Sequence, residues 1–124
     1  AGFATWHDGH VPAVRALNRG VRLIAHTVVE TYSVLTRLPP PHRVAPAVVR
    51  TYLASVSSAD YLTLESRAHR ELIDNLALHG ISGGATYDAL VASTADAAGA
   101  TLLTRDRRAI RTYELLEVGY ELVS

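Results

Sequence analysis

The stretch VRLIAHTVVETYSVLTRL, residues 21–38, decides the fold, because it passes from an apolar strand directly into a helix. Residues 21–25 form a short apolar run of the kind found in buried strands. From Thr27 to Leu38, Val28 and Leu35 recur at helical spacing, and the prolines at 39–41 end the run because proline lacks the N–H that a helix needs. We therefore expect a strand that leads straight into a helix.

The rest of the chain alternates in the same way. We expect further helices over residues 10–18, 47–56, 65–79, 85–98 and 107–114, and strands over residues 61–64, 101–103 and 120–123. Gly20 and Gly80 mark helix ends, and Pro46 suits a first helical turn. This alternation predicts an α/β fold in which helices cover both faces of a mainly parallel sheet.

Composition limits the class of protein. The chain has 124 residues, 48% of them hydrophobic and 19% charged, which is typical of one globular domain. It has no cysteine, which excludes disulfides, thiolate metal sites and a cysteine nucleophile and is consistent with the reducing cytoplasm. No apolar stretch has the length of a membrane span. The formal net charge of zero predicts that any nucleic-acid contact is confined to one face.

Three acidic residues lie where strands are expected to give way to helices. Glu30 is in the first turn after the strand at 21–25, Asp88 is in the first turns of the helix after Gly83-Gly84, and Asp106 follows the strand at 101–103. Ligands of open parallel sheets bind beyond the carboxyl ends of the strands. We therefore consider these acids together as candidate site residues.

Each acid also has a purely structural interpretation. Glu30 fits a capping box with Thr27, and Asp106 could cap the helix that follows it. Asp88 could pair with Arg105 or Arg108. Separate caps do not explain why three acids should share one rim, where repulsion would raise their pKa values unless they share a cation. Oxygen ligands suit Mg²⁺ or Mn²⁺, which activate water against phosphodiesters.

The motifs around these acids resemble those of VapC-type toxins of the PIN-domain family. They occur in the family's order over most of the chain, and they are HTVVE at 26–30, LTRLP at 35–39, ISGGA at 81–85, YDALVA at 87–92, LTRD at 103–106 and RAIRTY at 108–113. The resemblance implies a three-layer α/β/α fold, a Mg²⁺- or Mn²⁺-dependent endoribonuclease, a VapB-type antitoxin as partner, and dimers.

The resemblance also assigns roles to single residues. It implies that Glu30, Asp88 and Asp106 bind the metal and act in catalysis. It places Thr104 and Arg105 beside the scissile phosphate, while Arg108, in an arginine-rich segment, is a further candidate for contact with RNA phosphates. A solvated helix face is the alternative for these arginines.

One departure concerns the start of the chain. The family's opening strand and the aspartate on it have no counterpart before Ala1, so we expect a single PIN-like domain over 1–124 that lacks its first strand. This leaves two alternatives to a ribonuclease toxin. One is an inactive toxin fold that binds an antitoxin, and the other is an RNA-maturation nuclease of the same fold.

Other candidate residues carry less weight. The segment at 7–10, HDGH, lacks a convincing further metal ligand. Four tyrosines, at 32, 52, 87 and 113, could stack on RNA bases, but their helical context is more typical of core, which we expect for Tyr32 in particular. Trp6 and Val11 could face an antitoxin or a second toxin.

Overall fold

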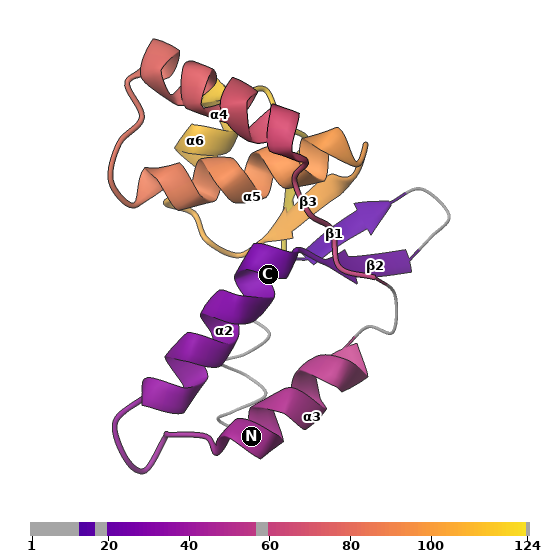
Figure 1. Ribbon diagram of the computed structural model, residues 1–124, viewed down its shortest axis with the longest axis vertical. Helices are drawn as coiled ribbons and strands as arrows, with labels where there is room; N and C mark the ends of the chain where they lie inside the picture. The colour runs from indigo at the N-terminus through magenta and orange to yellow at the C-terminus, as the bar shows by residue number, and fades with distance from the viewer. Residues whose placement is uncertain (1–12, 17–19, 57–59, 124) are drawn as a thin grey trace.

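The computed structural model describes residues 13–16, 20–56 and 60–123 (Figure 1). The helices are α2 (Ala25–Arg37), α3 (Pro46–Val56), α4 (Ser66–His79), α5 (Ala85–Ala97) and α6 (Ile110–Leu115). The strands are β1 (Ala13–Ala16), β2 (Gly20–Leu23), β3 (Thr101–Thr104) and β4 (Tyr120–Leu122). Among the described elements, four helices in a row separate β2 from β3, and strand and helix alternate from β3 onward.

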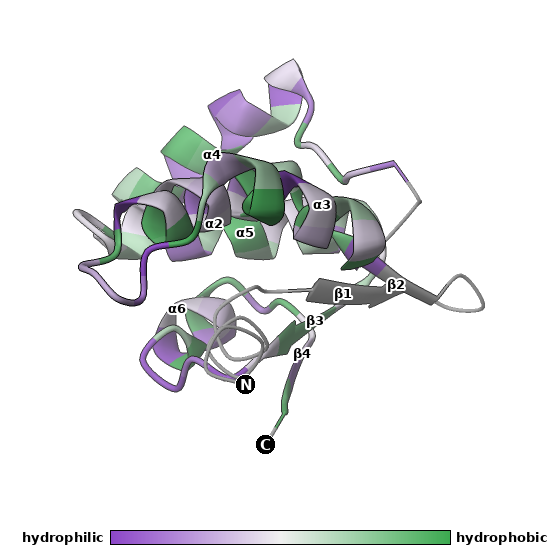
Figure 2. Cartoon of the chain, turned by 90° about the horizontal axis from the view of Figure 1, so that it is seen from below, coloured by the Kyte–Doolittle hydropathy of each residue, from purple (hydrophilic) through white to green (hydrophobic). Residues whose placement is uncertain are grey.

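The strands form one sheet in the order β2-β1-β3-β4. Strands β3 and β4 are parallel, whereas β1 is antiparallel to both of its neighbours. Helices α4, α5 and α6 are grouped together on one side of the sheet, where α6 packs against α5, whereas α2 and α3 extend away on the other (Figure 1 and Figure 2). The α/β class is confirmed, but the prediction of a mainly parallel sheet is wrong, because two of the three pairings among the described strands are antiparallel.

The error comes from the segment that was predicted as a helix over 10–18. Residues 13–16 form β1, and the rest of that segment lies outside the described residues, as do Trp6, Val11 and the HDGH segment. Only three residues separate β1 from β2, and strands this close in sequence pair antiparallel because a parallel pair needs a long crossover. Pairing on both edges outweighs the helix preference of Ala13 and Ala16.

Most other boundaries agree with the sequence. Helix α2 ends before the prolines, and α4 ends at Gly80, whose φ of 64° and the 2.9 Å bond from Ile81 N–H to the Leu76 carbonyl form a left-handed cap. Helix α6 begins at Ile110 instead of residue 107, after a turn. None of the described helices is long and apolar enough to cross a membrane.

The strand expected at 61–64 is reduced to one parallel bridge between Leu62 and Ile24. Two 2.9 Å bonds form it, from Leu62 N–H to the Leu23 carbonyl and from Ala25 N–H to the Leu62 carbonyl. Arg22 adds a bond of 3.0 Å from its Nε to the Asp60 carbonyl. These contacts hold the segment before α4 along the end of β2.

The main core lies between α5 and the sheet. Ala92, Ala95 and Leu102 are completely buried in it, and Ile24 and Tyr113 are almost so. Alanines allow the axis of α5 to approach β3 closely, and Leu102 fills the space below them. A smaller cluster of Leu72, Leu76 and Ala89 joins α4 to α5.

A second core holds α3 against α2, which together extend away from the other helices (Figure 1). It is built from Leu23, Val28, Leu35, Val49 and Leu53. Leu23 and Ile24 are neighbours in the chain but belong to different cores, as expected where successive side chains of an extended segment point to opposite sides.

The burial of the tyrosines differs from what the sequence predicts. Tyr32 is 41% exposed, so its assignment to the core is wrong, whereas Tyr113 is 2% exposed and is part of the main core. Tyr87, at 54%, is the most exposed of the large aromatic side chains in the described part of the chain.

We expect Leu102→Ala to lower the free energy of unfolding by about 2 to 5 kcal/mol, because it removes a fully buried side chain from a close-packed core. The matched control is Leu78→Ala on α4, where the leucine is 78% exposed and the change should stay within about 0.5 kcal/mol. Urea denaturation measures both values. Equal losses in the two variants would contradict the placement of Leu102.

Candidate active site

The three acids predicted from the sequence lie at the starts of three helical segments. Glu30 is in the second turn of α2, Asp88 is in the first turn of α5, and Asp106 follows β3 by two residues. The negative charges of Glu30 and Asp106 both raise the pKa of Asp88, so both carboxyl groups lie within electrostatic range of it. The structure therefore brings together acids that are up to 76 residues apart in the sequence.

Asp88 is the central member of this group. It is half-buried at the start of α5, and burial is the largest cause of the rise of its pKa above the ordinary value of 3.8. The charges of Asp106 and Glu30 raise the pKa further, while Arg108 opposes them. Of the two arginines expected to pair with Asp88, Arg108 is the one whose charge acts on it.

Asp106 is held by its own backbone surroundings. Its Oδ1 accepts a 3.0 Å hydrogen bond from the N–H of Arg108, and its own N–H donates to Thr104 Oγ1, also at 3.0 Å. The Arg108 Nε lies 3.6 Å from the same Oδ1, on a side chain that is 95% exposed. The predicted helix cap is wrong, because α6 begins at Ile110 with Ala109 at its N-cap position and no side-chain cap bond. The bond from the Arg108 N–H instead closes a turn, which fixes the orientation of a carboxylate that remains partly exposed.

Glu30 has a different neighbour from the one its sequence context suggests. Its Oε1 lies 2.8 Å from His26 Nε2, one helical turn earlier. The capping box is absent, because α2 begins at Ala25 and Thr27 donates instead to the Ile24 carbonyl at 2.8 Å. His26 Nε2 is buried without a hydrogen-bond partner among the described atoms, so its contact with Glu30 is close but poorly aligned.

Thr104 and Tyr113 support the site from the core. Thr104 is 4% exposed, so it has almost no surface with which to touch RNA, and its hydroxyl bonds to Asp106 and Tyr113. Burial, followed by the charge of Asp88, raises the pKa of Tyr113 to about 12. Tyr113 therefore stays a neutral phenol beside the acids at any physiological pH.

The sequence reasoning missed His26 and Tyr113 as parts of the site. The spacing of four between His26 and Glu30 is the signal that could have found the first. Nothing in the sequence distinguishes Tyr113 from an ordinary core tyrosine, because its link to the acids depends on the tertiary packing of α6.

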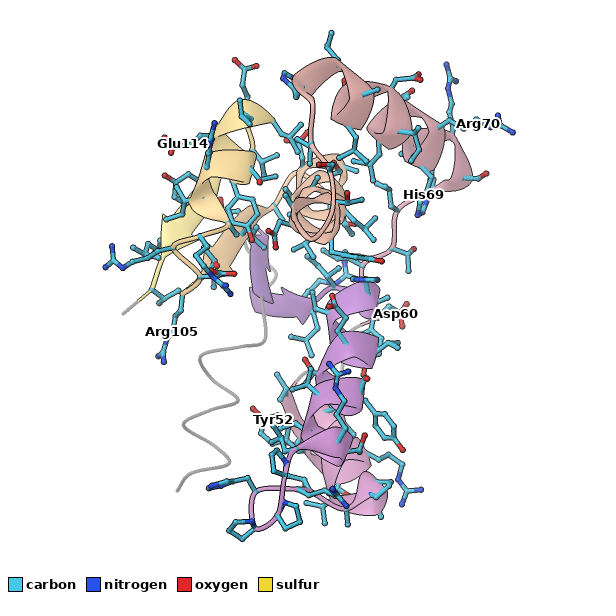
Figure 3. The ribbon with its side chains drawn as sticks, turned by 90° about the vertical axis from the view of Figure 1, so that its left-hand side faces the viewer. Tyr52, Asp60, His69, Arg70, Arg105 and Glu114 are labelled. Atoms are coloured by element: carbon cyan, nitrogen blue, oxygen red, sulfur yellow. The ribbon has the colours of Figure 1, made fainter. Side chains whose placement is uncertain are left out.

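Arginines surround Asp106 on the solvent side. Arg105, Arg107, Arg108 and Arg111 are all exposed, and Arg105 points away from the neighbouring elements (Figure 3). An open groove of about 560 Å³ runs along α6, and its described lining is Arg107, Ile110, Arg111, Glu114 and Leu115. The zero net charge of the chain thus conceals a local concentration of positive charge beside the acids.

The donor set suits a hard divalent cation. Glu30, Asp88 and Asp106 offer only oxygen, and their repulsion at Asp88 is not fully offset by Arg108. Within residues 13–16, 20–56 and 60–123 no three acidic or imidazole groups are close enough to enclose one ion. Mg²⁺ usually keeps several of its waters and therefore needs fewer protein ligands than a closed three-ligand site provides.

Comparison with known proteins identifies the family. The PIN domain model matches residues 1–115, which is most of the chain. This chain belongs to the PIN-domain family. The family's motifs identified in the sequence are therefore those of a true member, and Glu30, Asp88 and Asp106 lie within the matched region.

Relatives of this PIN domain are ribonucleases by name. The chain is 67% identical over all 124 residues to Ribonuclease VapC40 of Mycobacterium tuberculosis, in strains CDC 1551 / Oshkosh and H37Rv, and it covers 92% of that protein. It is 44% identical over 113 residues, or 90% of its length, to Ribonuclease VapC27 of strain H37Rv, of which the match covers 82%. No solved structure gives a significant match. The chain is thus a homologue of VapC toxins.

We expect Asp88→Asn to stabilise the PIN domain at pH 7 by up to about 1 kcal/mol, a small gain because water screens a half-buried group. A raised folded-state pKa means that the carboxyl group favours folding when protonated and loses that advantage as the pH rises. The gain of the variant should therefore shrink as the pH falls toward 3.8, the ordinary value for the unfolded chain.

Thermal melts across this pH range test the prediction. Asp74→Asn, on an exposed position of α4, is the matched control and should change the melting temperature little at any pH. A lower melting temperature for Asp88→Asn at pH 7 would show that the Asp88 charge stabilises the fold.

Proposed function

We propose that this PIN domain is a Mg²⁺- or Mn²⁺-dependent endoribonuclease that acts as the toxin of a toxin–antitoxin pair. The observation that carries the proposal is that Glu30 and Asp106 lie within electrostatic range of Asp88 and raise its pKa, in a chain that is 67% identical over its whole length to a ribonuclease. A cluster of partly exposed carboxylates in which the pKa of the central one is raised is characteristic of functional sites.

Glu30, Asp88 and Asp106 are the residues that would hold the ion. When bound, the ion supplies neutralisation of phosphate charge and a water of lowered pKa. Asp106 needs little reorganisation for this task, because the Arg108 N–H already fixes its Oδ1. Behind it, Thr104 and the neutral phenol of Tyr113 maintain the position of its backbone.

The exposed arginines are suited to the RNA backbone. Arg105 and Arg108 flank Asp106, and their guanidinium groups can contact phosphate oxygens on either side of it. They also lower the electrostatic barrier that an acidic rim presents to a polyanion. We therefore assign phosphate binding to Arg105 and Arg108, and we assign Thr104 the support of Asp106.

The same homology supports proposals for the partners of the chain and for its cellular location. We propose a VapB-type antitoxin as the protein partner, RNA as the substrate, a dimer or toxin–antitoxin hetero-oligomer as the assembly, and the cytoplasm as the location. The 67% identity to a VapC ribonuclease over the whole chain supports all four.

Cleavage by the purified chain tests the enzymatic proposal. We expect it to cut single-stranded RNA with Mg²⁺ or Mn²⁺ and not with EDTA. Asp88→Asn should lower the rate by at least about 100-fold, because even groups behind metal ligands cost about 10- to 100-fold when removed. The matched control is Asp96→Asn, at an exposed position near the end of the same helix, which should cleave like the wild type.

Ion binding gives a second measurement that does not depend on turnover. Mg²⁺ or Mn²⁺ should raise the melting temperature of the wild type and of Asp96→Asn but not that of Asp88→Asn.

The rival function is an inactive fold that binds only an antitoxin, and the absence of a closed three-ligand group among the described residues is the observation that favours it. Stable binding to an antitoxin with neither cleavage nor an ion-dependent shift would establish the rival.

A further inference from the structure

His26 and Tyr87 form a stacked aromatic pair beside the acids. Their ring centroids are 5.5 Å apart and the ring planes differ by 7°. His26 lies in the first turn of α2 and Tyr87 in the first turn of α5. The stack therefore joins the two helices that carry Glu30 and Asp88.

The pair is part of the acidic rim and not merely near it. Tyr87 immediately precedes Asp88 in the chain, and His26 Nε2 is 2.8 Å from Glu30 Oε1. A group that stacks on this pair would lie beside Glu30, at the start of the helix that carries Asp88. The stack is thus placed to act on the same ligand as the acids.

The stack is also open to solvent. Tyr87 is 54% exposed even though its ring stacks on His26. The side chain of His26 is 31% exposed. Large aromatic rings usually bury most of their surface, and an exposed flat ring beside a cleavage site is the surface on which proteins stack unpaired bases.

We propose that the Tyr87–His26 stack is a nucleobase-binding site, in which an unpaired RNA base stacks on the open part of Tyr87 and positions the adjoining phosphate at the acidic rim. The proposal deepens the proposed ribonuclease function and rests on it for the identity of the ligand. It restricts the substrate to single strands and loops, because a base within a duplex is already stacked on both faces.

Metal-free binding separates this proposal from catalysis. The probe is a single-stranded RNA oligonucleotide that carries one 2-aminopurine, titrated with the full chain in EDTA, so that fluorescence reports base stacking while no cleavage occurs. Tyr87→Leu retains an apolar cover for His26 but has no aromatic face. We expect it to raise Kd by about tenfold and to abolish the quenching of 2-aminopurine.

Two further variants complete the design. Tyr87→Phe keeps the ring and should bind within about twofold of the wild type, since stacking needs the face and not the hydroxyl. Tyr32→Leu is the matched control, because Tyr32 is 41% exposed on α2, the helix that carries His26, and takes no part in the stack. It should leave both Kd and quenching unchanged.

The proposal is overturned if the wild type does not quench the probe, if Tyr87→Leu binds like the wild type, or if Tyr87→Phe loses as much affinity as Tyr87→Leu. The last result would assign the effect to the hydroxyl group. A stack that merely clasps α2 to α5 would lower the melting temperature of Tyr87→Leu without changing its Kd, which also overturns the proposal. Because the titration is made in EDTA, failure of cleavage and failure of stacking are observed separately.

Discussion

Ala89, Ala92 and Ala95 are completely buried along one side of α5, which brings this helix closer to its neighbours than larger side chains would permit. This close approach determines how far the first turn of α5 lies from the end of β3. As a result, Asp88 is half-buried and lies within electrostatic range of Asp106. Tyr113 is buried near them, and both charges raise its pKa. Any larger residue on this side of α5 would move the acids apart as well as strain the core.

The parts of the fold that were predictable are those marked by local chemistry. The prolines after α2, Pro46 at the start of α3 and Gly80 after α4 act within one or two residues, so the sequence alone located these boundaries. Strand β1 was missed because two of its four residues are alanines and a third is arginine, which favour helix over strand. They are extended because they pair with strands on both edges, one of which lies about ninety residues away in the chain.

The site shows the same division. Glu30, Asp88 and Asp106 could be selected because each stands at a junction that the sequence reveals. Their surroundings could not, since His26 stacks on Tyr87 only when α2 and α5 are brought together, and Tyr113 reaches Thr104 only when α6 packs beside α5. Asp106 does not cap α6, as its position before residue 107 suggested, because a turn comes between them, and the bond within that turn orients its carboxylate.

The separation of Leu23 and Ile24 into two cores has a consequence for motion. Helix α3 is attached to the molecule mainly through the cluster that contains Leu23, whereas α5 belongs to the cluster that contains Ile24. Two cores of different size open with different free energies, so the amide hydrogens of α3 would exchange with solvent ahead of those of α5. Glu30 and His26 are carried by the helix that spans this division, and the geometry of the rim therefore depends on how often the smaller cooperative unit opens.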